Sequence, residues 1–155
     1  MTAVARDPDV ARHTYVSSPF ETDDAVAWIG RYVEGWKDGS CAGFAIEDED
    51  GAFLGFCALV KINHKESEAE IGYITVPEAR GRGIGTRMLR LISRWALAEV
   101  GLERVELNIA VDNPASAAIA ERAGFRHEGT LRSVYFKDDR RIDLMIYGRL
   151  KTDPD

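Results

Sequence analysis

The sequence has few of the residues that build metal centres or covalent cross-links. Its 155 residues include two cysteines, Cys41 and Cys57, in separate strand-like stretches without metal-type spacing. We therefore expect free, buried thiols in a reducing compartment. The three histidines, His13, His64 and His127, are scattered along the chain. The sequence predicts no metal site and no disulfide framework.

Long apolar runs and an excess of positive charge are also absent. No stretch approaches the roughly 20 apolar residues of a membrane-spanning helix, and residues 1–10 lack the basic-then-apolar pattern of a secretory signal. We therefore expect a cytoplasmic protein without membrane contact. The formal net charge of −6 argues against nucleic acid as the main partner and weakly favours a cationic substrate. A hydrophobic content of 45% fits a single globular domain, which we place over residues 1–155.

Hydrophobic periodicity divides the first half of the chain into one helix and three strands. Residues 1–20 show little periodicity and are expected to form an irregular lead-in. Thr22 is the expected N-cap of a helix whose apolar side chains recur at helical spacing as far as Trp36. Three antiparallel strands follow, over Cys41–Glu47, Ala52–Asn63 and Glu68–Val76.

The second half predicts a crossover helix, a parallel strand and a closing hairpin. The helix runs from Gly83 to about Val100, and the alternating stretch Val105–Val111 is a strand. A strand, a crossover helix and another strand imply a parallel pair. A short helix begins at Asn113-Pro114, and residues 125–135 and 141–150 pair as a hairpin. We therefore expect an α/β fold of the α+β kind, with a mostly antiparallel central sheet that contains one parallel strand pair.

Three glycines at alternate positions, Gly81, Gly83 and Gly85, leave the backbone bare where the crossover helix begins. The first amides of a helix have no intrahelical partner, and the helix dipole is positive there, so this turn predicts an anion site such as one for a pyrophosphate. The spacing fits neither the dinucleotide fingerprint nor the nucleotide-triphosphate loop. Three arginines flank the turn: Arg80, Arg82 and Arg87.

The turn resembles the Arg-x-x-Gly-x-Gly acyl-CoA motif of the GNAT superfamily of N-acetyltransferases, as Arg80, Gly83 and Gly85. The resemblance extends from about Asp7 to the C-terminus. Within the superfamily the chain is most similar to the branch that acetylates N-terminal amines of ribosomal proteins. The matching pieces include Asp7–Val10, Ala69–Tyr73, Asn113–Ser116, Ala123–Phe125 and Asp143–Tyr147.

This resemblance implies acetyl-CoA as co-substrate and no metal. Backbone donors of the glycine turn would hold the pyrophosphate, and the pantetheine arm would run beside the end of the preceding strand. A backbone amide near Val76 would act as oxyanion donor to the thioester. The implied cofactor-binding residues are Ile74, Thr75, Val76, Arg80, Gly81, Arg82, Gly83, Ile84, Gly85, Thr86, Asn113 and Ser116.

The resemblance also implies catalytic candidates. Asn113 would contact the pantetheine arm and Ser116 the cofactor sulfur, although the two residues also suit a helix cap and its first turn. Many GNAT enzymes use a tyrosine as general acid at the position that matches Ala120 here. Some ribosomal-protein acetyltransferases have a glutamate at the position that matches Tyr135. Glu70 is the remaining candidate for a general base; otherwise it is a charged residue on a solvated strand.

One departure from the family concerns the start of the chain. The family opens with an edge strand and a helix before the segment that matches Asp7–Val10, whereas six residues precede that segment here. Without that strand, Cys41–Glu47 becomes an exposed sheet edge, which proteins usually cover. We therefore expect a second copy of the chain, as a homodimer, or a rearranged N-terminal segment to cover it.

Two functions fit the sequence. The first is an N-acetyltransferase that transfers acetyl from acetyl-CoA to a primary amine by direct attack in a ternary complex. Its acceptor would be a protein N-terminus or a small amine such as an antibiotic or polyamine. The second is a non-catalytic acyl-CoA-binding module with a regulatory or interaction role.

Overall fold

The protein is a six-stranded mixed sheet covered by helices, as seen in a computed structural model that describes residues 4, 7–14 and 21–154. The sheet order is β1-β2-β3-β4-β6-β5, with β3 and β4 parallel, which confirms the predicted class. The elements are α2 (Pro8–His13), α3 (Thr22–Asp38), β1 (Ala42–Glu47), β2 (Phe53–Asn63), β3 (Glu68–Thr75), the 3-10 turn η1 (Pro77–Ala79), α4 (Ile84–Ala98), β4 (Arg104–Ala110), α5 (Pro114–Arg122), β5 (Arg126–Lys137) and β6 (Arg140–Leu150).

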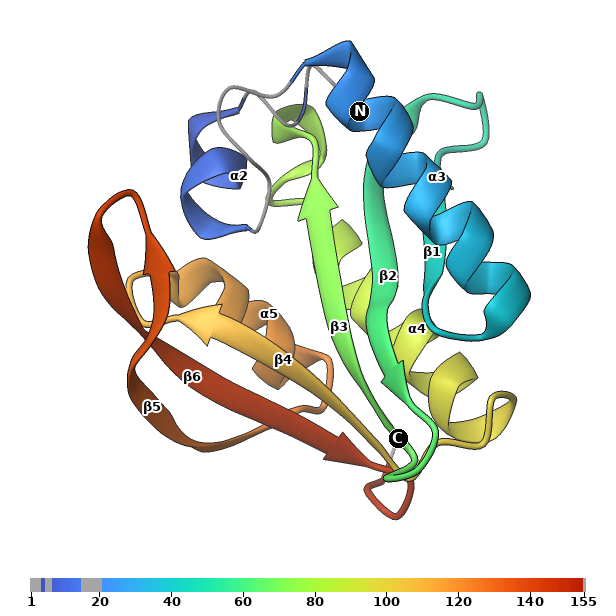
Figure 1. Ribbon diagram of the computed structural model, residues 1–155, viewed down its shortest axis with the longest axis vertical. Coiled ribbons are helices and arrows are strands. Elements are labelled where there is room, and N and C mark those ends of the chain that lie inside the picture. Colours follow the sequence, from blue (N-terminus) through green and yellow to red (C-terminus); the bar gives the residue numbers. More distant parts are fainter. Residues whose placement is uncertain (1–3, 5–6, 15–20, 155) are drawn as a thin grey trace.

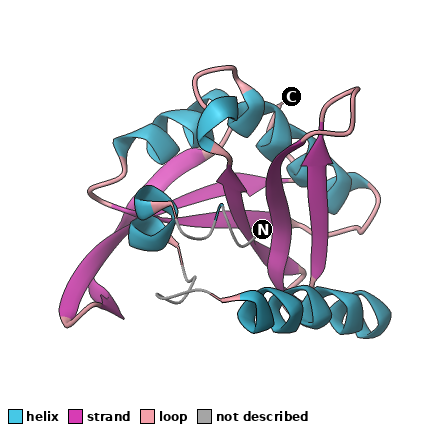
Figure 2. Ribbon diagram, turned by 90° about the horizontal axis from the view of Figure 1, so that it is seen from above, coloured by secondary structure: helices cyan, strands magenta, loops and turns pink. Residues whose placement is uncertain are grey.

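Helices lie on both faces of the sheet. Helices α4 and α5 cover one face, and α3 lies on the other (Figure 2), while α2 lies at the open end between β3 and the β5–β6 hairpin (Figure 1). The main core forms under α4, where Met88, Leu89 and Ile92 pack on inward-facing residues of the central strands. These side chains recur at helical spacing, so one side of α4 is buried against the sheet. In the described part of the chain, no helix is long and apolar enough to cross a membrane.

Strands β3 and β4 pair over only three residues each and then separate. Their parallel register joins Glu68–Glu70 to Arg104–Glu106. Beyond these pairs, β3 stays bonded to β2 as far as Thr75, and β4 stays bonded to β6 as far as Ala110. The two halves of the sheet therefore open as a V between β3 and β4 (Figure 1).

The structure corrects two expectations near the N-terminus. Residues 8–13 form the helix α2 within the lead-in that was expected to be irregular. Pro8 occupies its first turn, where a missing N–H costs little, and the Asp7 carboxylate accepts hydrogen bonds from the Asp9 and Val10 amides. Helix α3 is capped by Glu21 and not by Thr22, because the Glu21 amide donates to Asp24 three residues later.

Strand β1 lies at the sheet edge, as expected, and aromatic side chains enclose part of it. Trp36 of α3 stacks on Trp95 of α4 with ring centroids 6.0 Å apart, and Phe44 of β1 meets both rings edge-on. Because α3 and α4 lie on opposite faces, these rings meet around the edge strand. A second copy on this edge stays a prediction.

The core under α4 makes one stability prediction. Leu89→Ala removes a side chain with no exposed surface, so we expect a loss of about 2–5 kcal/mol in the free energy of unfolding. Leu91→Ala, on the same helix but 58% exposed, should change it by less than about 1 kcal/mol. Urea unfolding of both variants measures the contrast, and similar losses would contradict the packing described.

Candidate functional site

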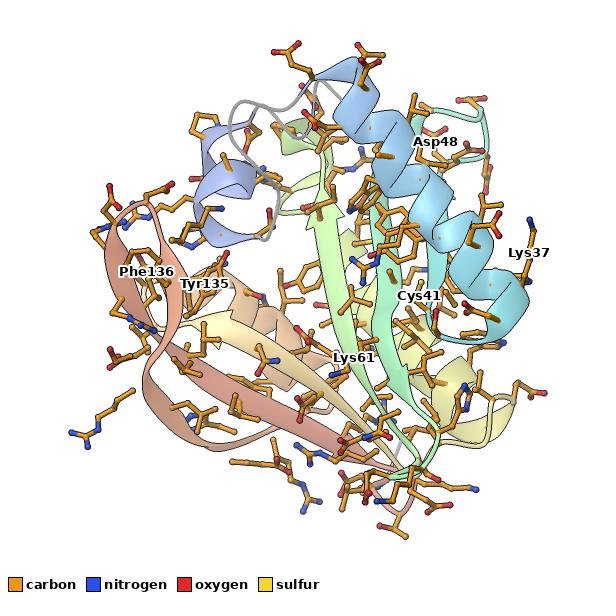
Figure 3. All side chains as sticks on the ribbon, in the orientation of Figure 1. Lys37, Cys41, Asp48, Lys61, Tyr135 and Phe136 are labelled. Atoms are coloured by element: carbon orange, nitrogen blue, oxygen red, sulfur yellow. The ribbon has the colours of Figure 1, made fainter. Side chains whose placement is uncertain are left out.

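The divergence of β3 and β4 opens a cavity of about 1550 Å³. Its walls come from β3, β4, the turn before α4, the first turn of α5, and the inner sides of α2 and α3. Lys61 on β2 also lines it and can be located in Figure 3. The cavity is thus lined by elements from both faces of the sheet.

The glycine turn forms one rim of this cavity, with its backbone open to a ligand. Gly81 and Gly83 have φ values of 70° and 77°, a region that favours glycine. A Cβ at either position would meet nothing within 4 Å, so the space beside the backbone is free. Gly83 is the N-cap of α4, and the amides of its first turn point out of the helix end. This geometry suits the predicted anion site.

Positive charge gathers around the cavity in a protein of net charge −6. Acidic residues on its wall are Asp9, Glu70 and Asp112. Basic residues on its wall are Arg31, Lys61, Arg80, Arg87, Arg90 and Arg122. A concave surface with this local excess attracts an anion despite the opposite sign of the whole molecule. No group of three metal-ligating side chains occurs in the described ranges.

Most of the predicted cofactor-binding residues lie on the cavity wall, and two do not. Ile74, Thr75, Ile84 and Thr86 line it together with the three glycines, Arg80, Asn113 and Ser116. Arg82 is exposed and lies outside the lining.

Val76 is buried beneath the wall, and its amide donates to the Leu54 carbonyl at 3.0 Å. The expectation that an amide near Val76 acts as oxyanion donor is therefore wrong for Val76 itself, because pairing with β2 already uses that N–H.

Arg80 holds α2 against the glycine turn. Its guanidinium lies 2.8 Å from the Asp7 carboxylate and 3.2 Å from that of Asp9. The hydrogen bond from Arg80 keeps the pKa of the Asp7 carboxyl below its ordinary value. At the other end of α2, Arg12 pairs with Asp112 at 2.6 Å. Helix α2 thus bridges the two arms of the V.

Asn113 and Ser116 occupy the opposite wall, at the start of α5. The Asn113 side chain caps α5 by accepting a hydrogen bond from the Ser116 amide at 3.1 Å. The Ser116 hydroxyl lies 2.8 Å from the Tyr73 hydroxyl of β3. This contact crosses the cleft and links β3 to the first turn of α5.

Glu70 lies at the closed end of the V, in the last residue pair that joins β3 to β4. Burial raises the pKa of its carboxyl above the ordinary value, and repulsion from Glu106 adds to this. A hydrogen bond with Asn108 opposes the rise. Glu70 is therefore a half-buried cavity residue and not a charge on a solvated strand.

Sequence reasoning missed several residues that the cavity brings together. Tyr73 contacts Ser116 across 43 positions of sequence. His13 lies 99 positions from Asp112, yet its Nδ1 is 3.5 Å from the Asp112 carboxylate on the cavity wall. Asn108 reaches Glu70 from the neighbouring strand. Alternation could place Tyr73 and Asn108 on a strand face, but no local pattern pairs residues that far apart.

The splayed parallel pair, the glycine turn and the helix start are the features that the sequence resemblance associates with acyl-CoA-binding transferases. The family model described as an acetyltransferase (GNAT) domain matches residues 1–126. The chain therefore belongs to the GNAT acetyltransferase family, which uses acetyl-CoA.

Curated relatives agree with this family, and a solved structure shares its fold. The provisionally named ribosomal N-acetyltransferase YdaF of Bacillus subtilis is 36% identical over 102 residues, which are 66% of this chain and 56% of that protein. Phosphinothricin N-acetyltransferase of Streptomyces coelicolor is 34% identical over 88% of this chain and 80% of its own. Spermidine N-acetyltransferase of Vibrio cholerae, solved with CoA and spermine, has a TM-score of 0.84 at 23% identity and covers 98% of this chain and 88% of its own.

The Arg80 contact predicts a pH-dependent attachment of α2. Asp7→Asn keeps a capping side chain but removes the charge that pairs with Arg80. At pH 7 we expect faster hydrogen exchange at the Ala11 and Thr14 amides in the variant. Because the folded pKa of Asp7 is lowered, the stabilisation is complete above about pH 4 and is lost as the pH falls through that folded value.

The difference between wild type and Asp7→Asn should therefore shrink toward pH 3. Asp9→Asn is the matched control, since its side chain is 74% exposed and its ion pair is longer. Equal exchange in wild type and Asp7→Asn at pH 7 would contradict the role given to this ion pair.

Proposed function

We propose that the protein is an acetyl-CoA-dependent N-acetyltransferase that acetylates a primary amine by direct attack in a ternary complex. The observation that supports this most is the cleft itself: a glycine-turn anion site at its rim, Ser116 on one wall and Glu70 at its closed end. Acetyl-CoA supplies the thioester, and the residues of the chain bind it, orient it and manage protons.

The fit to acetyl-CoA rests on the glycine turn and β3. Amides of residues 81–86, at the positive end of α4, suit the pyrophosphate. A Cβ built at Gly81 or Gly83 would meet nothing within 4 Å, so the pyrophosphate has room beside this stretch of backbone. The pantetheine arm would pass between Ile74–Thr75 and Asn113, the two walls that face each other across the V.

Direct transfer is favoured because the described cysteines are poorly placed to carry an acetyl group. Cys41 and Cys57 are 4% and 1% exposed, and neither lines the cavity. Burial raises the pKa of the Cys57 thiol to about 12, so it stays protonated. Cys41 lies beside α3, and its thiol donates a hydrogen bond to the Arg31 carbonyl at 3.7 Å (Figure 3).

Proton handling would be divided between Ser116 and Glu70. Ser116 would donate a hydrogen bond to the sulfur as the carbon–sulfur bond breaks. Glu70 would take a proton from the acceptor ammonium, directly or through water. Placing the sulfur at Ser116 moves the reacting carbon deeper than Val76, to the level of Tyr73, and so toward Glu70.

The acceptor is a primary amine of a protein N-terminus or a small molecule. The relatives named above carry acceptors of three kinds in their names: a ribosomal protein, phosphinothricin and spermidine. An N-terminal α-amine, with a pKa near 8, needs less help from a base than a lysine.

We further propose a cytoplasmic location. We also propose a homodimer in which a second copy of the chain covers β1, the strand at the edge of the sheet.

Thiol release from acetyl-CoA tests the activity directly. Wild type should turn over with one class in a panel of N-terminal peptides, polyamines, phosphinothricin and aminoglycosides. Acetyl-CoA binding without turnover on any amine would instead favour a binding module.

Glu70→Gln should lower kcat/KM about 100-fold, the scale of general-base catalysis. Since the base acts as a carboxylate and its pKa is raised, wild-type kcat/KM should fall as pH drops through that pKa. The variant should lack this acid limb. Glu68→Gln, on the same strand but outside the cavity, is the control; if its activity falls as far as that of Glu70→Gln, Glu70 is not the base.

A further inference from the structure

We propose that Tyr73 is a positioning residue that orients the Ser116 hydroxyl toward the sulfur of acetyl-CoA. This inference rests on the proposed function of the cleft. It starts from the 2.8 Å contact between the two hydroxyl groups, which joins β3 to the first turn of α5. Both residues line the cavity, so the pair stands where a ligand between the walls would meet it.

The direction of this hydrogen bond follows from the chemistry of the two groups. A phenol is more acidic than an aliphatic alcohol and is the better donor. Burial raises the pKa of Tyr73 to about 12, so it keeps its proton throughout the neutral range. With Tyr73 donating, Ser116 Oγ acts as the acceptor and its own hydrogen is left to point at another group.

The surroundings fix the position of both hydroxyl groups. The Ser116 amide donates a hydrogen bond to the Asn113 side chain, which fixes the conformation of the first turn of α5. The Tyr73 ring packs beside Gly85, where an added Cβ would lie 3.6 Å from the ring. The two anchors come from opposite arms of the V, so the hydroxyl pair has one geometry as long as the cleft keeps its width.

The pair acts on the leaving group and is not consumed. The amine nitrogen forms a bond to the carbonyl carbon, the carbon–sulfur bond breaks, and its electron pair goes to the sulfur. Ser116 donates a hydrogen bond to that developing thiolate while it accepts one from Tyr73. The proton lost by the amine equals the one finally taken up by the thiol, so Tyr73 ends the cycle unchanged.

Tyr73→Phe tests the role because it keeps the ring and removes only the hydroxyl. We expect kcat to fall roughly tenfold, the scale of one hydrogen bond, with the KM for acetyl-CoA nearly unchanged. The double variant Tyr73→Phe/Ser116→Ala should be no slower than Ser116→Ala alone, because Tyr73 acts only through Ser116. Tyr147→Phe is the matched control: it is also buried and hydrogen-bonded, to Glu121, but lies outside the cavity.

A second measurement does not depend on turnover. The pKa of the CoA thiol bound to the protein can be followed by the ultraviolet absorbance of the thiolate. It should be lower on wild type than on Tyr73→Phe or Ser116→Ala, by about one unit. Melting temperatures of the free proteins check that each variant is folded.

The outcomes separate the two proposals. Equal thiol pKa values and rates in Tyr73→Phe and wild type, or additive losses in the double variant, would overturn the role of Tyr73. Absence of turnover on every amine, with the thiol pKa still sensitive to Tyr73, would overturn the proposed function and leave the contact with sulfur supported. Failure of CoA to bind would overturn both.

Discussion

The site depends on how little of β3 and β4 is paired. Three residue pairs, ending at Glu70 and Glu106, hold the two parallel strands together before they separate. Each strand keeps its bonds to an outer neighbour, β2 or β6, so the separation exposes backbone only toward the cleft. A sheet with full β3–β4 pairing would close the cavity and leave no room for an acyl chain between its halves.

Helix α4 connects this divergence to the glycine turn. It is the crossover between β3 and β4, so its N-terminus must lie near the open end of β3. The glycines that begin it keep that end bare, and its apolar side is buried under the sheet. The same burial that stabilises the fold therefore fixes the direction of the helix dipole toward the cleft.

Helix α2 adds a second connection across the opening. It contacts Arg80 at the β3 side and Asp112 at the β4 side through ion pairs. A pyrophosphate at the glycine turn would lie close to Arg80, whose guanidinium already pairs with the Asp7 carboxylate. An anion bound at the turn and helix α2 would therefore interact with the same guanidinium.

The sequence by itself predicted the order of the elements from residue 21 onward, the parallel pair, the glycine turn and eleven of the residues that line the cavity. Those features follow from local periodicity, turn chemistry and the resemblance to the GNAT motif. Helix α2 was missed because its six residues are too few to show a helical period. The Glu21 cap was missed because the neighbouring Thr22 is the stronger capping residue by type.

Only the tertiary structure decided which groups meet and which are already occupied. It paired Tyr73 with Ser116, Glu70 with Asn108 and Arg80 with Asp7. It also showed that the Val76 amide is used by β2. These contacts join residues far apart in sequence. They depend on how neighbouring strands are paired and on where the helices and turns pack, which no single segment of the chain specifies.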